Sequence, residues 1–166
     1  MRSNPITTRT RLALFSLIAG YVASALSGAS AGQAAFSGLA GSWSGTGSIS
    51  LADGSRERIR CKASYLVSQA EGRLQQSLKC ASDSYRFDLM TDLISQQQRV
   101  AGSWSESSRG IGGTIVGKES GGAITAVVDA PGFSARLSLT VRGDSQSVSI
   151  ASDGEIRSVT IGLRRN

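Results

Sequence analysis

Two cysteines are the residues whose type and spacing point most directly to a defined chemistry. Cys61 and Cys80 lie on two runs with alternating apolar positions, separated by a polar break at residues 68–72. Such alternation is typical of strands with one buried face. If residues 69–72 form the turn of a hairpin, Cys61 lies directly opposite Cys80. We therefore predict a disulfide, and two unrelated buried thiols are the alternative interpretation.

The composition gives little support for catalysis. The chain contains no histidine, which excludes Ser-His-Asp and Cys-His nucleophile systems and removes a common zinc ligand. Acidic residues stand singly in turns, where aspartate serves turn geometry. The glycine-rich residues 110–113 precede no helix that would bind a phosphate. We expect no enzymatic activity, no metal and no cofactor.

The first 31 residues have the pattern of a cleaved secretory signal peptide. Three arginines precede a mostly apolar run, Leu12–Leu26, and small residues follow it before Gly32. The run is shorter than the about 20 apolar residues of a membrane span, although an uncleaved anchor is the alternative. We therefore predict export to the periplasm of a Gram-negative-type envelope, or secretion, where disulfides persist. No integral membrane span is expected after cleavage.

Cleavage also changes the charge of the mature chain. Removing the three leader arginines from 18 Lys and Arg leaves 15, against 12 Asp and Glu, for a net charge of +3. A nucleic-acid-binding domain is usually markedly more basic, so we expect no nucleic-acid partner. The rest divides into a flexible N-terminal segment at residues 32–38 and a single domain at residues 39–166.

The elements that position the cysteines are short alternating runs ended by Gly, Asp, Ser or Gln. They predict an all-β fold of about ten antiparallel strands in up-and-down order. Because no helical pattern covers this meander, it must close on itself or fold into two sheets. The up-and-down order with short links favours closure, and we predict a calycin-like barrel. The expected strands are residues 41–51, 59–67, 74–80, 84–93, 99–106, 111–118, 123–130 and 133–142, and one on each side of Asp153–Gly154.

Turn residues set the expected registers of these strands. We place the turns at residues 53–55, 82–83, 143–144 and 153–154. The resulting pairs are Trp43 with Tyr65, Cys80 with Tyr85, Leu139 with Val148, and Val148 with Val159.

Residues 41–47 read Gly-Ser-Trp-Ser-Gly-Thr-Gly. This stretch resembles the Gly-x-Trp opening of the calycins, which include the lipocalins, and in particular the Gly-x-Trp-x-Gly-x-Gly first strand of nitrobindin-like barrels. The resemblance implies a calycin-like barrel in which Trp43 plugs the closed end. Nitrobindin-like proteins bind haem through a histidine. Because this chain has none, the resemblance does not extend to haem binding.

Binding is the function class that remains. We expect a mostly apolar interior with a few polar groups, which suits a small apolar or amphipathic ligand. The alternative is that these side chains simply fill a core. Glu106, at the end of a strand, is expected at the solvated rim. The candidate ligand-lining residues are Trp43, Tyr65, Gln76, Leu78, Phe87, Trp104, Leu137 and Gln146.

One outward row of basic residues is a candidate contact for an anionic envelope component. The row consists of Arg56, Arg58, Arg60, Lys62 and Lys79. Its alternative role is a solvated face that prevents edge-to-edge aggregation.

Two other functions stay open. One is a protein-binding module, such as a periplasmic protease inhibitor, whose residues 32–38 enter the cleft of a partner. The other is an outer-membrane barrel, which the missing terminal aromatic residue, aromatic girdles and long outer loops disfavour.

Overall fold

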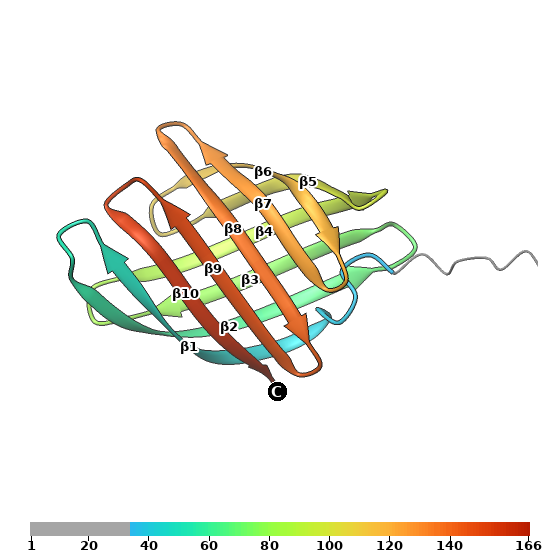
Figure 1. The fold of residues 1–166 in the computed structure, drawn as a ribbon, viewed down its shortest axis with the longest axis horizontal. Coiled ribbons are helices and arrows are strands. Elements are labelled where there is room, and N and C mark those ends of the chain that lie inside the picture. Colours follow the sequence, from blue (N-terminus) through green and yellow to red (C-terminus); the bar gives the residue numbers. More distant parts are fainter. Residues whose placement is uncertain (1–33) are drawn as a thin grey trace, which may run out of the picture. The chain divides into compact units, whose positions relative to one another are not determined.

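The computed structural model describes residues 34–166. The predicted signal peptide lies outside the described residues. Ten antiparallel strands close into one barrel, in which each strand pairs with its neighbours in sequence and β1 pairs with β10 (Figure 1). The predicted all-β barrel is confirmed. The strands are β1 (Gly41–Leu51), β2 (Arg56–Ser68), β3 (Arg73–Ala81), β4 (Arg86–Gln96), β5 (Arg99–Glu106), β6 (Ile111–Ser120), β7 (Ala123–Ala130), β8 (Phe133–Arg142), β9 (Ser145–Ser152) and β10 (Ile156–Arg165).

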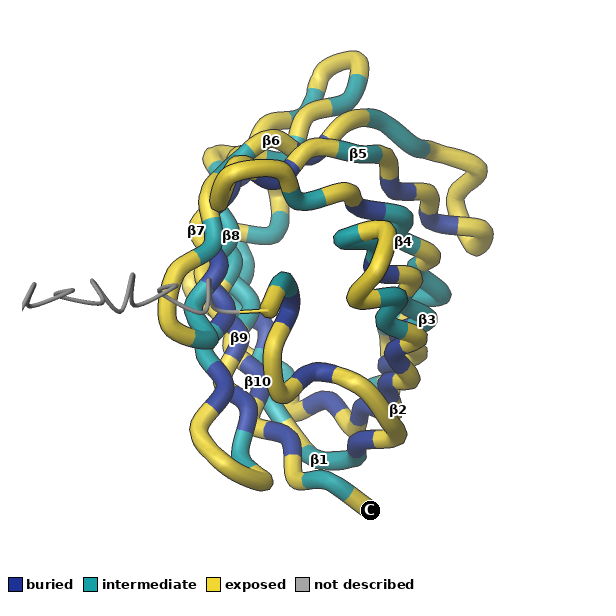
Figure 2. Tube along the Cα trace, turned by 90° about the vertical axis from the view of Figure 1, so that its right-hand side faces the viewer, coloured by how far each residue is buried: buried dark blue, intermediate teal, exposed yellow. Residues whose placement is uncertain are grey.

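Alternating burial along the strands defines the two faces of the barrel wall. On β2, Ile59, Cys61, Ala63 and Tyr65 are buried, and the residues between them are exposed. A similar alternation runs along other strands such as β5 and β9 (Figure 2). Because strand side chains point to opposite faces in turn, the buried apolar residues of β2 face inward and its exposed charged residues face water.

The β2–β3 hairpin has the predicted register. Cys61 pairs with Cys80 and Ser68 pairs with Arg73. The two sulfur atoms form a disulfide, and the Cα atoms lie 4.1 Å apart. The interpretation as two unrelated thiols is therefore wrong. The bond ties two adjacent strands of the barrel wall on their inner face.

Reducing this bond is expected to lower the free energy of unfolding by at most about 3 kcal/mol, the chain-entropy value for a loop of this length. The effect should be smaller than for a long loop, because the hairpin already brings the two residues together. Urea unfolding with and without reductant measures the difference. The Cys61→Ala/Cys80→Ala variant is the control, and a native protein that is as indifferent to reductant as this variant would contradict the expectation.

Three of the expected registers are wrong by two residues, those of β1–β2, β3–β4 and β9–β10. Trp43 pairs with Ala63, not with Tyr65. The three-residue loop is Ala52–Gly54 rather than residues 53–55, because Gly54, with φ +87°, takes its last position. The Leu51 N–H accordingly donates to the Ser55 carbonyl, at 2.9 Å.

The β3–β4 turn shifts in the same way. Cys80 pairs with Phe87, not with Tyr85. The turn is Asp83–Ser84 rather than Ser82–Asp83, since the Ser82 N–H donates to the Tyr85 carbonyl at 2.8 Å.

Of the last two hairpins, β8–β9 has the expected register and β9–β10 does not. Leu139 pairs with Val148 as predicted. Val148 pairs with Ile161 rather than Val159, because the connection between β9 and β10 also includes Glu155, whose carbonyl accepts the Ala52 N–H. Every error is an even number of residues, so each side chain keeps its predicted face.

Candidate functional site

The interior of the barrel contains a cavity of about 350 Å³. Its walls are mostly aliphatic and aromatic side chains. The cavity reaches the loops at one end of the barrel, which we call its mouth. The exposed residues Arg109, Gly154 and Glu155 border it there. A volume of this size lies at the lower end of the range for small-molecule sites. Six of the eight candidate lining residues border the cavity: Tyr65, Gln76, Leu78, Phe87, Trp104 and Leu137.

The other two candidates, Trp43 and Gln146, do not border the cavity. Trp43 is fully buried and belongs to the closed end of the barrel. Gln146 lies behind Tyr65 and donates from its Nε2 to the Tyr65 hydroxyl at 2.7 Å. Neither residue therefore forms part of the cavity wall: Trp43 packs at the closed end, and Gln146 holds the Tyr65 hydroxyl. Contact of the other six with a ligand stays a prediction.

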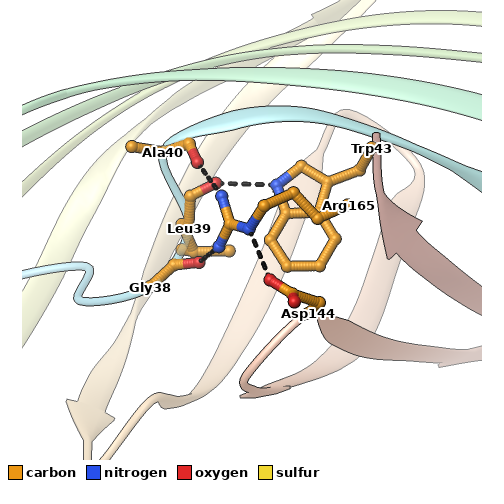
Figure 3. A network of polar contacts seen from close by, with 6 residues as sticks. All are labelled: Gly38, Leu39, Ala40, Trp43, Asp144 and Arg165. Carbon is orange, nitrogen blue, oxygen red and sulfur yellow. Dashed lines mark hydrogen bonds and ion pairs between the residues drawn. The ribbon is translucent and has the colours of Figure 1, made fainter.

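The closed end is held by Trp43 and Arg165 (Figure 3). The Trp43 Nε1–H donates to the Leu39 carbonyl at 2.8 Å. The Arg165 guanidinium lies 4.3 Å from the centre of the Trp43 ring and donates to the carbonyls of Gly38 and Ala40 and to the Asp144 carboxylate. A single cation thus joins the segment before β1, the first strand and the β8–β9 turn.

β1 lies close to β10 because two of its inward positions are glycine. A Cβ on Gly45 would lie 2.0 Å from the Gly162 carbonyl oxygen, and one on Gly47 would lie 2.1 Å from that of Thr160. No side chain fits at such distances. The glycines of the first strand therefore allow β1 and β10 to close the barrel.

The segment before β1 packs on the closed end. Phe36 is buried, and its N–H donates to the Glu119 Oε2 at 2.9 Å. The other Glu119 oxygen accepts from the Ser95 hydroxyl at 2.6 Å. Residues 34–40 lie across the end of the barrel that faces the viewer in Figure 2.

A polar group lies near the closed end of the cavity. The Tyr65 hydroxyl accepts hydrogen bonds from Gln146 Nε2 at 2.7 Å and from Gln76 Nε2 at 3.3 Å. Burial raises the pKa of Tyr65 to about 12, although both amides work in the opposite direction. The hydroxyl is therefore neutral across the physiological range.

Glu106 is not the solvated rim residue that the sequence suggested, since it is only 2% exposed. Its carboxylate accepts the backbone N–H groups of Asp88, Ser108 and Arg109 at 2.9, 3.0 and 2.8 Å. Burial raises the pKa of Glu106, but these hydrogen bonds outweigh it and leave the pKa below its ordinary value. Glu106 thus fixes the β5–β6 loop at the mouth of the cavity.

Replacing Glu106 with glutamine is expected to cost about 1.5–3 kcal/mol at neutral pH, because hydrogen bonds to a charged acceptor become neutral ones. A folded-state pKa below the ordinary 4.5 stabilises the fold above that pH and loses the effect as pH falls through the folded value. The gap between native and variant should therefore narrow in acid. Urea unfolding from pH 7 to pH 3 measures it.

The control for this substitution is Glu155→Gln, which changes an exposed carboxylate at the same mouth. It should leave the free energy of unfolding almost unchanged. Equal effects of the two substitutions would mean that the three backbone contacts of Glu106 do not stabilise the loop.

Aromatic side chains form much of the mouth, and sequence reasoning found only part of them. Tyr85 stacks on Phe87 with ring centres 6.2 Å apart, and Phe133 lies 5.9 Å from Trp104. The Arg109 guanidinium covers the Phe87 ring at 5.0 Å. Tyr85 shares the strand period of Phe87, so its inward face was detectable, whereas nothing in the sequence indicated that the loop would place Arg109 there.

The basic row of β2 and β3 faces outward, away from the cavity. Arg56, Arg58, Arg60, Lys62 and Lys79 are all exposed. Lys79 pairs with Asp88 at 3.4 Å, and exposed pairs of this kind stabilise little. Contact of the row with an anionic envelope component stays a prediction.

Comparisons with known proteins concern the fold. No protein-family model and no curated protein matches the chain. The crystal structure of Rv2717c from M. tuberculosis matches with a TM-score of 0.64 and 17% identity, over 80% of this chain and 95% of that one. The structure of the S-type phycobiliprotein lyase CPES from Guillardia theta matches with a TM-score of 0.50 and 14% identity, over 79% and 90%.

Within residues 34–166, no helix has the length and apolar character to cross a membrane. At identities of 17% and 14%, the two matches establish a common architecture and no activity. The chain therefore shares its fold with Rv2717c and with the phycobiliprotein lyase.

Proposed function

We propose that this protein is an exported, non-enzymatic β-barrel that binds a small apolar or amphipathic ligand, or an apolar part of an envelope component, inside the barrel. The observation that carries the proposal is the cavity of about 350 Å³, with mostly apolar walls and an end bordered by exposed loops. Removing apolar surface from water contributes roughly 25 cal/mol for each Å², so an apolar molecule gains free energy by entering. A dry apolar cavity of about half this size already binds a ring as small as benzene.

The cavity also bears on the alternative that the inner side chains simply fill a core. Native interiors rarely leave voids larger than a water molecule. A cavity that can hold a small ligand is therefore better explained by binding than by packing. Export is supported by the Cys61–Cys80 disulfide, because such bonds persist in oxidising compartments.

The two other functions find less support. In the protease-inhibitor alternative, residues 32–38 enter the cleft of a partner, but Phe36 is buried against the barrel and bonded to Glu119. In an outer-membrane barrel the apolar band faces outward. Here charged residues of β2 such as Arg58 and Lys62 face outward while Ile59 and Tyr65 are buried.

Two measurements test the proposal. Native mass spectrometry of protein purified from its own host should show a bound small molecule, and an apolar fluorescent dye should bind the purified protein with a one-to-one stoichiometry. Protein without bound mass that also takes up no dye would overturn the proposal. Dye uptake that persists after the cavity is blocked would place binding on the outer surface instead.

A further inference from the structure

The polar group near the closed end of the cavity crosses the barrel interior. Tyr65 belongs to β2, Gln76 to β3 and Gln146 to β9. β2 and β9 are separated in the barrel wall by β1 and β10. The hydrogen bond between Tyr65 and Gln146 therefore joins two strands that are not neighbours in the wall. We call these three residues the floor of the cavity.

The floor does not satisfy its own hydrogen-bonding capacity. Both recorded hydrogen bonds of the Tyr65 hydroxyl are ones that it accepts, so its own proton remains available. Among residues 34–166, the buried Oε1 of Gln146 has no donor. Buried polar groups are nearly always paired, and one without a partner costs about 1–3 kcal/mol. Because both amides donate to the Tyr65 hydroxyl, this hydroxyl can still donate one hydrogen bond, and Tyr65 borders the cavity.

The charged groups that border the cavity lie away from the floor. They are Glu106, Arg109 and Glu155, from the ends of β5 and the loops at the mouth. Glu106 already accepts three backbone hydrogen bonds. A ligand with a charge at its inner end would bury that charge next to neutral groups only, which is costly. A neutral oxygen at the same place would accept a hydrogen bond from the Tyr65 hydroxyl.

We propose that the floor is a specificity-determining subsite for a neutral oxygen, with Tyr65 as hydrogen-bond donor and Gln76 as a second polar contact. The preferred ligand is then an apolar molecule that carries a hydroxyl group at its buried end, such as a phenol or an alcohol. A hydrocarbon of the same shape binds less tightly, and a carboxylate binds least. Gln146, which does not border the cavity, acts as a positioning residue that holds the Tyr65 oxygen. This inference rests on the proposed binding function and adds the chemical class of the ligand.

The test compares three probes that differ in one group: 4-pentylphenol, pentylbenzene and 4-pentylbenzoate. Each displaces the apolar dye from the native protein in a competition titration at pH 8, where the benzoate is ionised. We expect the phenol to bind at least about fivefold more tightly than pentylbenzene, the ratio for one net hydrogen bond. The benzoate should bind more weakly than both.

Tyr65→Phe removes the hydroxyl and keeps the ring, so the preference for the phenol over pentylbenzene should fall to about one. Tyr85→Phe is the matched control, because it removes a tyrosine hydroxyl from the mouth of the same cavity, and it should keep the preference. Unchanged binding of pentylbenzene shows that each variant still has its cavity. Gln146→Met is a second variant, expected to reduce the preference without abolishing binding of pentylbenzene.

Two outcomes would overturn the subsite while leaving the binding function intact. One is equal affinity of native protein for the phenol and pentylbenzene, and the other is a preference that survives in Tyr65→Phe. If the dye and all three probes fail to bind the native protein, the proposed function falls, and the subsite falls with it.

Discussion

Replacing Trp43 with alanine is expected to lower the free energy of unfolding by about 3–5 kcal/mol, a large part of the total stability of a domain of this size. Trp43 has no exposed surface, and its indole N–H donates to the Leu39 carbonyl. The substitution also removes the ring on which Arg165 lies. Because this pair fastens the segment before β1 to the last strand, the closed end should loosen with it. Urea unfolding followed by circular dichroism measures the loss.

Trp104→Ala is the comparison for this substitution. Trp104 is also mostly buried, but it borders the cavity, so part of its ring already lacks packed neighbours. The cost should be smaller, because fewer contacts disappear and the new space joins an existing void. A larger loss at Trp104 than at Trp43 would contradict the assignment of Trp43 as the plug of the closed end.

Replacing Ala135 with tryptophan is expected to weaken binding of the apolar dye at least tenfold. Ala135 is buried and borders the cavity from β8, so an indole at this position occupies the space that a ligand would take. A tenfold loss corresponds to about 1.4 kcal/mol. The substitution should leave the barrel folded, since the added volume enters an existing void, although some strain remains. Dye titration and circular dichroism on the same samples give both readings.

The matched control is Ala101→Trp, which makes the same exchange on the outer face of β5. Ala101 is exposed and pairs with Ile94 and Val116, which are also exposed. Dye affinity inside the barrel should not change in this variant. Equal loss of affinity in both variants, or none in Ala135→Trp, would show that the dye does not bind in the cavity.

The fold could be predicted far into its details because local signals agreed with each other. Alternation assigned each strand its inner face, and the turns that the sequence placed lie within one residue of the observed ones. The cysteine pair followed from one register, since the turn before Arg73 left a single arrangement that brings the two residues opposite each other. The three wrong registers arose where a turn could shift by one position along the chain without violating any turn preference.

The candidate site was predictable only in part. Tyr65 and Gln76 belong to adjacent strands, so their shared face follows from the hairpin register. The contact of Tyr65 with Gln146 does not, because it spans 81 residues and depends on how far the closed barrel narrows. Glu106 was misplaced for a similar reason. Its position at a strand end suggested solvent, but the loop that follows folds back and gives it three backbone donors.

The strands, their inner and outer faces, the disulfide and the closed antiparallel order could therefore be predicted from the chain alone. Each of them depends on neighbouring residues and on the two-residue period of a strand. The hollow interior and the polar floor of the cavity could be known only from the folded barrel. Those features depend on the curvature and diameter of the closed wall, which are set by all ten strands together and by glycines such as Gly45 and Gly47 that let β1 approach β10.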